Sequence, residues 1–249
     1  DAYQKSIELM DKVARYQQSL GMRPLEVREL PFEVLSPGVV LDATQHVLAN
    51  LRRIKEELGI DRRIEEPSFE PGRNPTEVYE LLWRSSYLLD GLTRALQPSD
   101  VFVKEERIRR EIELLAGNLD QLALPADLLE RPLESFPNKV PRDVLMENFV
   151  NMYVIARIQR ALDMQPFYVP PLPGGSITPA NVYDTALVIL GQLHRIKAEA
   201  GIELRASAPS VDEEKTPSDV YAVAKRVQAH LQAMHESVAN GQDGADGRR

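Results

Sequence analysis

Residues 51–60 read LRRIKEELGI, and residues 193–202, which lie 142 positions further on, read LHRIKAEAGI. The same offset aligns residues 1–98 with residues 143–240 without a gap, and 30 of the 98 aligned pairs are identical. Repetition of this kind is typical of folds that stack one structural unit. The sequence therefore predicts an internally duplicated protein.

A shorter unit repeats within each half. Apolar or small residues alternate in it at steps of four and three, the 3.5-residue spacing of helices that pack at shallow angles in bundles. This pattern predicts an all-α, internally duplicated helical-bundle or helical-repeat protein with about seven helices of about 21 residues each. The copies begin at Ala2, Val40, Val78, Val101, Val144, Val182 and Val220.

The ends of these segments carry helix signals. Thr216-Pro217-Ser218-Asp219 offers a capping residue, a proline at the first helical position and an acid that completes a capping box. Gly59 and Gly201 follow their helices where a left-handed C-terminal residue is favoured, and Asp163 occupies that place in another copy.

Long proline-bearing loops are expected to join the helices. A 17-residue loop spans about 50 Å when extended, whereas a 21-residue helix is about 30 Å long. Each loop can therefore return along its helix, so that successive helices run parallel. At Gln97-Pro98 the connection is short, and we expect an antiparallel hairpin there. The four loops are residues 23–39, 61–77, 165–181 and 203–219.

Two lobes are expected. Because the second would have three helices against four in the first, its apolar face near Val220–Val238 is expected to be uncovered and available to a partner. The first lobe would be 1–123 with helices near 2–22, 40–60, 78–97 and 100–122, followed by a linker at 124–142, a second lobe at 143–240 with helices near 144–164, 182–202 and 220–240, and a disordered tail at 241–249.

Composition narrows the class of protein. A net charge of −8 argues against nucleic-acid binding, and no apolar run approaches the length of a transmembrane segment. The absence of Cys excludes disulfides and thiol catalysis. A start at Asp1 without an initiator Met favours a chain whose signal peptide has been removed, so we expect a periplasmic or secreted protein, with a cytoplasmic one as the alternative.

Recurring polar and aromatic residues are candidate binding groups. Arginine at segment position 14 could hold an anion, but that position lies away from the apolar stripe, which favours bonds to the carbonyls of a returning loop. Tyrosine at position 2 could form an aromatic platform, although packing beneath a loop is favoured. The residues concerned are Arg15, Arg53, Arg157, Arg195, Tyr79, Tyr183 and Tyr221.

No catalytic or metal motif stands out. His230 and His235 are five residues apart, which does not place two ligands on one helix face, and neither a phosphate loop nor a nucleophile elbow occurs. We therefore expect a non-catalytic protein without cofactor or metal: an exported bacterial binding or adaptor module that contacts a protein partner or itself. The alternative is a sensor or carrier of a small anionic ligand, bound between the lobes.

Overall fold

The computed structural model describes residues 2–27, 36–62, 72, 74–90, 92, 96–207, 209–210 and 213–246, and most of them are helical. No strand occurs among them, which confirms the all-α prediction. The helices are α1 (Ala2–Ser19), α2 (Pro37–Glu57), α3 (Pro75–Asp90), α4 (Pro98–Asn118), the 3-10 turn η1 (Asp120–Leu122), α5 (Ala126–Glu130), α6 (Pro141–Ala161), α7 (Pro179–Glu199) and α8 (Pro217–Asp246).

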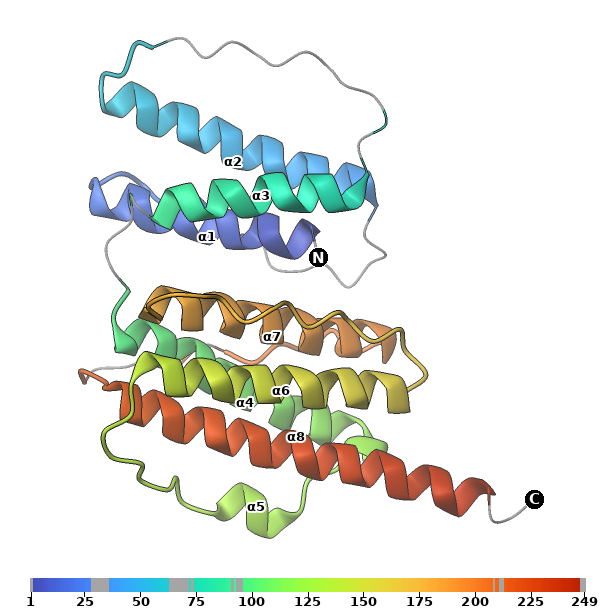
Figure 1. The fold of residues 1–249 in the computed structure, drawn as a ribbon. Helices are drawn as coiled ribbons and strands as arrows, with labels where there is room; N and C mark the ends of the chain where they lie inside the picture. Colours follow the sequence, from blue (N-terminus) through green and yellow to red (C-terminus); the bar gives the residue numbers. More distant parts are fainter. Residues whose placement is uncertain are drawn as a thin grey trace. The chain divides into compact units, whose positions relative to one another are not determined.

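The chain divides into two compact units, unit 1 (Asp1–Ala95) and unit 2 (Leu96–Arg249). In unit 1, α1 packs on α2 and on α3. In unit 2, α6 packs on α7 and on α8, so the three C-terminal helices repeat the arrangement of the first three. Unit 2 has a fourth long helix, α4, which packs on the same two helices as α6 (Figure 1).

The expected boundary after residue 123 is therefore wrong, because α4 belongs to the second bundle. Its apolar stripe, including Ile108 and Ile112, is buried in one core with α7 and α8. The hairpin expected at Gln97-Pro98 would join α3 of unit 1 to α4 of unit 2, and it stays a prediction. The face near Val220–Val238 is also not uncovered, since α4 packs on α8 and Val220, Val227 and Val238 are buried.

The four long helices of unit 2 run parallel. The proline at the start of each helix, with the valine three residues later, lines one small apolar cavity at one end of the bundle. The connection between α6 and α7 must therefore return along the bundle, as Figure 1 shows. The residues that meet there are Pro98, Val101, Pro141, Val144, Pro179, Val182, Pro217 and Val220.

Parallel helices bring like ends of their dipoles together, and polar side chains at the helix starts offset this repulsion. Asp100, Asp143 and Asp219 each accept a hydrogen bond from the backbone N–H three residues earlier, at 2.8–3.0 Å. Each places a negative charge at the positive end of its helix. The predicted capping boxes are thus confirmed for these helices, and Asn181 makes the neutral version with Thr178.

The helix ends also behave as expected. Gly201 has φ +69°, and Asp163 adopts the same left-handed conformation with φ +56°. The N–H of the following residue, Ile202 or Met164, donates to the carbonyl five residues earlier at 2.8 and 2.9 Å. These are the bonds of a helix that ends with a left-handed residue.

A buried glutamine clasp recurs in both units. Gln159 donates to Gln192 at 3.0 Å and accepts a hydrogen bond from the backbone N–H of Phe167 at 3.0 Å. At the equivalent positions, Gln17 donates to Asn50 at 3.1 Å and accepts from the N–H of Leu25 at 2.6 Å. The same device thus ties two helices and the start of the returning loop together in each half.

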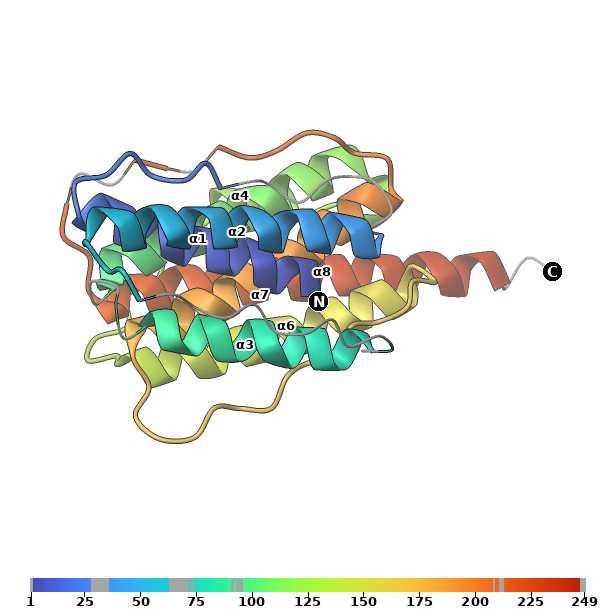
Figure 2. The ribbon, with the colours of Figure 1, turned by 90° about the horizontal axis from the view of Figure 1, so that it is seen from above.

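The expected disordered tail is wrong for residues 241–246, because α8 continues to Asp246. Figure 2 shows this end of α8 extending beyond the other helices of its unit. A helix that already exists gains one hydrogen bond for each residue added, which allows it to continue through Gly241 and Gly244. Residues 247–249 lie outside the described residues.

Two truncated chains test the corrected boundary. Residues 96–249 keep all four helices of unit 2, and we expect this chain to unfold cooperatively. Residues 124–249 lack α4 and expose the apolar faces of α7 and α8, so we expect aggregation or loss of cooperativity. Circular dichroism melting and light scattering measure both; equal behaviour of the two chains would contradict the assignment of α4.

Candidate functional site

The contact between α4 and α7 centres on a buried carboxylate. Glu111 is fully buried and accepts hydrogen bonds from Lys197 Nζ and from the backbone N–H of Ala206, the latter at 3.1 Å. His194 Nε2 lies 3.3 Å from the same carboxylate. Burial alone would raise the pKa of Glu111, but the bonds from His194 and Lys197 outweigh it and lower the pKa to about 2.

A second buried carboxyl group lies nearer the start of α4. Asn148 Nδ2 donates to Glu105 Oε1 at 2.6 Å and to Thr185 Oγ1 at 3.1 Å. Burial raises the pKa of Glu105 to about 7; the Asn148 bond lowers it and the charge of Glu147 raises it further. Among the described residues, no cation compensates for its burial as Lys197 does for Glu111, so Glu105 keeps its proton up to a pH of about 7.

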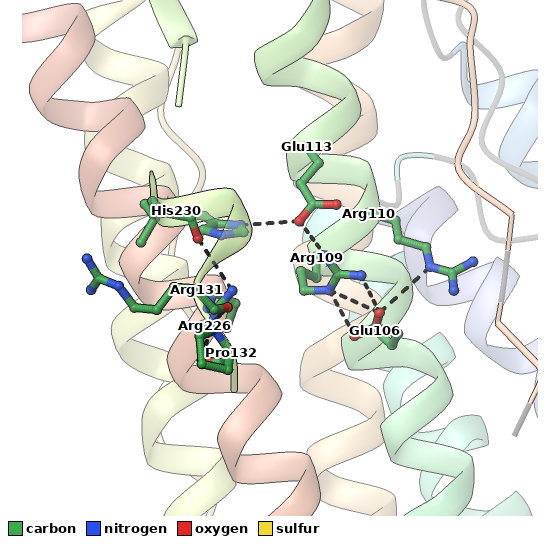
Figure 3. A network of polar contacts seen from close by, with 9 residues as sticks. Glu106, Arg109, Arg110, Glu113, Arg131, Pro132, Arg226 and His230 are labelled. Carbon is green, nitrogen blue, oxygen red and sulfur yellow. Dashed lines mark hydrogen bonds and ion pairs between the residues drawn. The ribbon is translucent and has the colours of Figure 1, made fainter. Parts of the chain in front are cut away.

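An ionic network connects α4 with α8 (Figure 3). Arg109 bonds Glu106 and Glu113 on its own helix, and Glu113 lies 3.9 Å from His230 Nδ1 on α8. His230 is fully buried. Its pKa is lowered to about 4 by burial first and then by the charges of Arg226 and Arg109.

Arg226 fastens the linker that precedes α6. Its guanidinium donates to the carbonyls of Leu128, Arg131 and Pro132, at the end of α5 and just beyond it (Figure 3). A cation at a helix C-terminus bonds the carbonyls that have no partner within the helix. Arginine does therefore hold a returning segment, but the residue that does so most fully is not one of the four singled out from the sequence.

The four candidate arginines do not form one site in either unit. Arg15 pairs with Asp11 at 3.0 Å, and Arg53 donates to Asn50 at 3.1 Å, both in unit 1. In unit 2, Arg195 donates to the carbonyl of Gln165 at 2.5 Å, the type of loop contact that the sequence favoured. The fourth, Arg157, is exposed on α6.

Arg157 lines an open groove of about 400 Å³ between α6 and α8, together with His235 and Glu236. Burial lowers the pKa of His235, and the charge of Arg157 lowers it further. Glu236 places a negative charge in the same groove, which opposes binding of an anion. This groove gives the small-anion alternative no distinct support.

The candidate tyrosines pack against neighbouring segments of the chain. Tyr183 is buried, with Lys104 Nζ 5.1 Å from its ring centre. Tyr221 packs edge-to-face on Phe136 of the linker, with the ring centres 5.2 Å apart, and Lys139 lies over its ring. Tyr79 on α3 is half-buried. The arrangement of Tyr221 is the packing beneath a loop that the sequence favoured.

Among the described residues, an exposed apolar surface lies on two helices of unit 1. Five leucines, two on α2, two on α3 and one just beyond α3, are 47–71 % exposed, although the residues at the equivalent places on α7 and α8 are at most 5 % exposed. We call them the leucine face. In order, Leu41, Leu48, Leu81, Leu88 and Leu92 correspond to Tyr183, Leu190, Val223, His230 and Met234.

Much of this difference comes from α4, although α5 and the residues just after it also lie against α8. Helix α4 touches Tyr183 through Lys104, Lys197 through Glu111 and His230 through Glu113. In unit 1, α2 and α3 flank α1 as α7 and α8 flank α6, but no described helix of that unit takes the place of α4. Sequence analysis placed the missing fourth helix in the wrong half. The spacing from Val101 to Val144 is 43 residues, close to the repeat of 38, and it could have indicated the correct half.

The other exposed side chains of the described residues form no candidate reaction site. Trp83 and Tyr87 stack with ring centres 6.0 Å apart on another exposed face of α3. Within the described part of the chain, no cluster of three or more potential ligands could hold a metal ion. No helix there has both the length and the apolarity to cross a membrane.

Comparison with known proteins adds no family. No family model matches the chain, and neither the curated proteins nor the solved structures gave a match. The candidate site therefore rests on the geometry of the two units.

Replacing Glu105 tests the buried carboxyl. Because its folded pKa of about 7 lies above the ordinary value of 4.5, the folded state binds more protons between these pH values, and the associated stability is lost as the pH rises through about 7. Glu105→Gln should therefore be more stable than the natural chain at pH 8, by about 3 kcal/mol, and similar at pH 4. Urea unfolding from pH 4 to 8 measures this.

His230 gives the stability the opposite dependence on pH. Its lowered pKa makes the folded state bind fewer protons than the unfolded state below pH 6.5, so its contribution to stability increases as the pH rises. The difference between the two chains isolates Glu105, because His230 is common to both. Glu130→Gln, on an exposed part of α5, is the matched control. If the difference in free energy of unfolding between Glu105→Gln and the natural chain does not change with pH, the pKa of Glu105 is not raised.

Arg195→Ala tests the contact with the loop. Loss of the bond to Gln165 should lower the free energy of unfolding by about 1 kcal/mol. The matched variant Arg157→Ala should change it by less than about 0.5 kcal/mol, as is usual at exposed positions. Chemical denaturation compares the two, and equal losses would show that the loop bond contributes nothing.

Proposed function

We propose that this protein is a non-catalytic interaction module that binds a helix of a protein partner on the leucine face of unit 1. The observation that carries the proposal is the set of five exposed leucines at positions whose equivalents in unit 2 are at most 5 % exposed. A contiguous apolar surface of this kind on a folded protein marks a site of interaction.

The shape of the site favours a helix as the bound element. On α3, Leu81 and Leu88 are seven residues apart and therefore lie on one side of the helix. On α2, Leu41 and Leu48 are also seven residues apart. Two helices that each present such a stripe offer the groove in which an amphipathic helix is commonly recognised.

Unit 2 supports this reading because it contains the filled version of the same arrangement. There α4 places Ile108, Ile112 and Leu115 in a common core with α7 and α8, and all three are fully buried. The equivalents of that surface in unit 1 remain apolar although they are exposed. Burial of a leucine side chain contributes about 1.5–3 kcal/mol, so several exposed leucines favour binding of a partner.

Selection from a displayed library of 24-residue peptides tests this function. The full chain should enrich peptides whose apolar residues recur at helical spacing, and Leu88→Asp should abolish their binding because it places a charge in the groove. The control is Leu172→Asp, which changes an exposed leucine of the α6–α7 connection. Calorimetry of the enriched peptides measures affinity.

Leu88→Asp should melt close to the natural chain, since Leu88 is 71 % exposed. Peptides that bind equally to the natural chain and to this variant, or a selection without enrichment, would refute the proposed site.

A further inference from the structure

We infer that the helix bound by the leucine face resembles α4 itself, with an apolar stripe and a carboxylate that meets Lys55. This inference rests on the proposed function and specifies the chemistry of the partner. It follows from the internal duplication, because unit 2 contains a helix seated on the equivalent surface. Each contact of α4 can therefore be transferred, position by position, to unit 1.

The polar contact of Lys197 has a close counterpart in unit 1. Lys197 Nζ bonds Glu111 of α4 and also donates to the carbonyl of Leu204 at 2.9 Å. Its equivalent, Lys55, donates to the carbonyl of Arg62, which is the residue equivalent to Leu204. The lysine is therefore held by the same loop carbonyl in both units, and in unit 2 its other contact is the carboxylate supplied by the fourth helix.

The charge requirement in unit 1 is stronger than in unit 2. His194, which lies 3.3 Å from Glu111, has a pKa lowered first by burial and is therefore held toward its neutral form. The residue in its place is Arg52, which is exposed and permanently charged. A positive charge thus replaces the histidine three residues before Lys55, and a carboxylate at the position of Glu111 complements Lys55.

At two other positions the partner must differ from α4. Lys104 and Glu113 of α4 meet Tyr183 and His230, whose equivalents in unit 1 are Leu41 and Leu88. A charged residue facing either leucine would lose its hydration without gaining a partner. The partner helix therefore carries apolar residues at these two places and keeps the acid of Glu111.

A synthetic peptide of residues 96–119 provides the probe, titrated into the full chain by fluorescence anisotropy. We expect saturable binding to the natural chain and to Leu172→Asp, and loss of binding to Leu88→Asp. Changing Glu111 to Gln in the peptide should weaken binding about tenfold, the loss of roughly one charge-assisted hydrogen bond. Changing Glu113 to Leu should strengthen it severalfold, because the leucine then meets Leu88.

A double-mutant cycle separates the contact with Lys55 from a general loss of structure. In a chain carrying Lys55→Met, the Glu111→Gln peptide and the natural peptide should bind equally, because the partner of the carboxylate is gone. Equal effects of the peptide change in both chains would refute the pairing. Binding that persists in Leu88→Asp would show that the peptide enters unit 2 instead, which also overturns the inference.

Other outcomes distinguish this inference from the proposed function. Absence of peptide binding, combined with library peptides that require Leu88 but no acid, would overturn the α4-like partner and leave the helix-binding function intact. Sedimentation equilibrium addresses a second copy as the occupant. A dimer that Leu88→Asp dissociates, and that the peptide does not displace, would also overturn the inference.

Discussion

Burial of α4 between α7 and α8 is the interaction on which the organisation of this protein depends. It closes the core of unit 2, in which Ile108 and Ile112 of α4 are buried together with Leu193 of α7 and Val227 of α8. It also brings Glu111 to Lys197, so that the apolar stripe is locked in one register by a buried ion pair. A buried pair contributes more to specificity of position than to stability, because desolvation offsets much of its attraction.

Parallel packing imposes a second constraint, since every connection must travel the length of a helix before the next one begins. Local contacts that recur at the helix ends, rather than one large core, hold these connections in place. Left-handed residues end the helices, and the glutamine clasps of Gln17 and Gln159 bind the chain as it turns back. Arg226 performs a related task for the linker before α6. These contacts satisfy backbone groups that such loops would otherwise leave without partners.

The two units differ in a way that relates fold to function. The residues that line the missing position in unit 1 have not become polar, as an exposed surface would favour, but are leucines. At the same time, the lysine that meets a carboxylate in unit 2 is retained as Lys55. An apolar groove bordered by a retained cation is physically matched to a helix that resembles α4, and this match is the basis of the proposed interaction.

Sequence by itself determined what depends on neighbouring residues: the helices, their capping boxes, the left-handed conformation at Gly201, and the duplication that defines equivalent positions. The left-handed conformation at Asp163 appeared only in the structure. Beyond the hint in the spacing from Val101 to Val144, the sequence left open which bundle α4 joins. An amphipathic stripe requires that one face be buried, but the stripe of α4 is compatible with either half. Only the tertiary structure decided this, through contacts between distant residues such as Glu111 and Lys197, and it thereby placed the uncovered face on unit 1 rather than on α8.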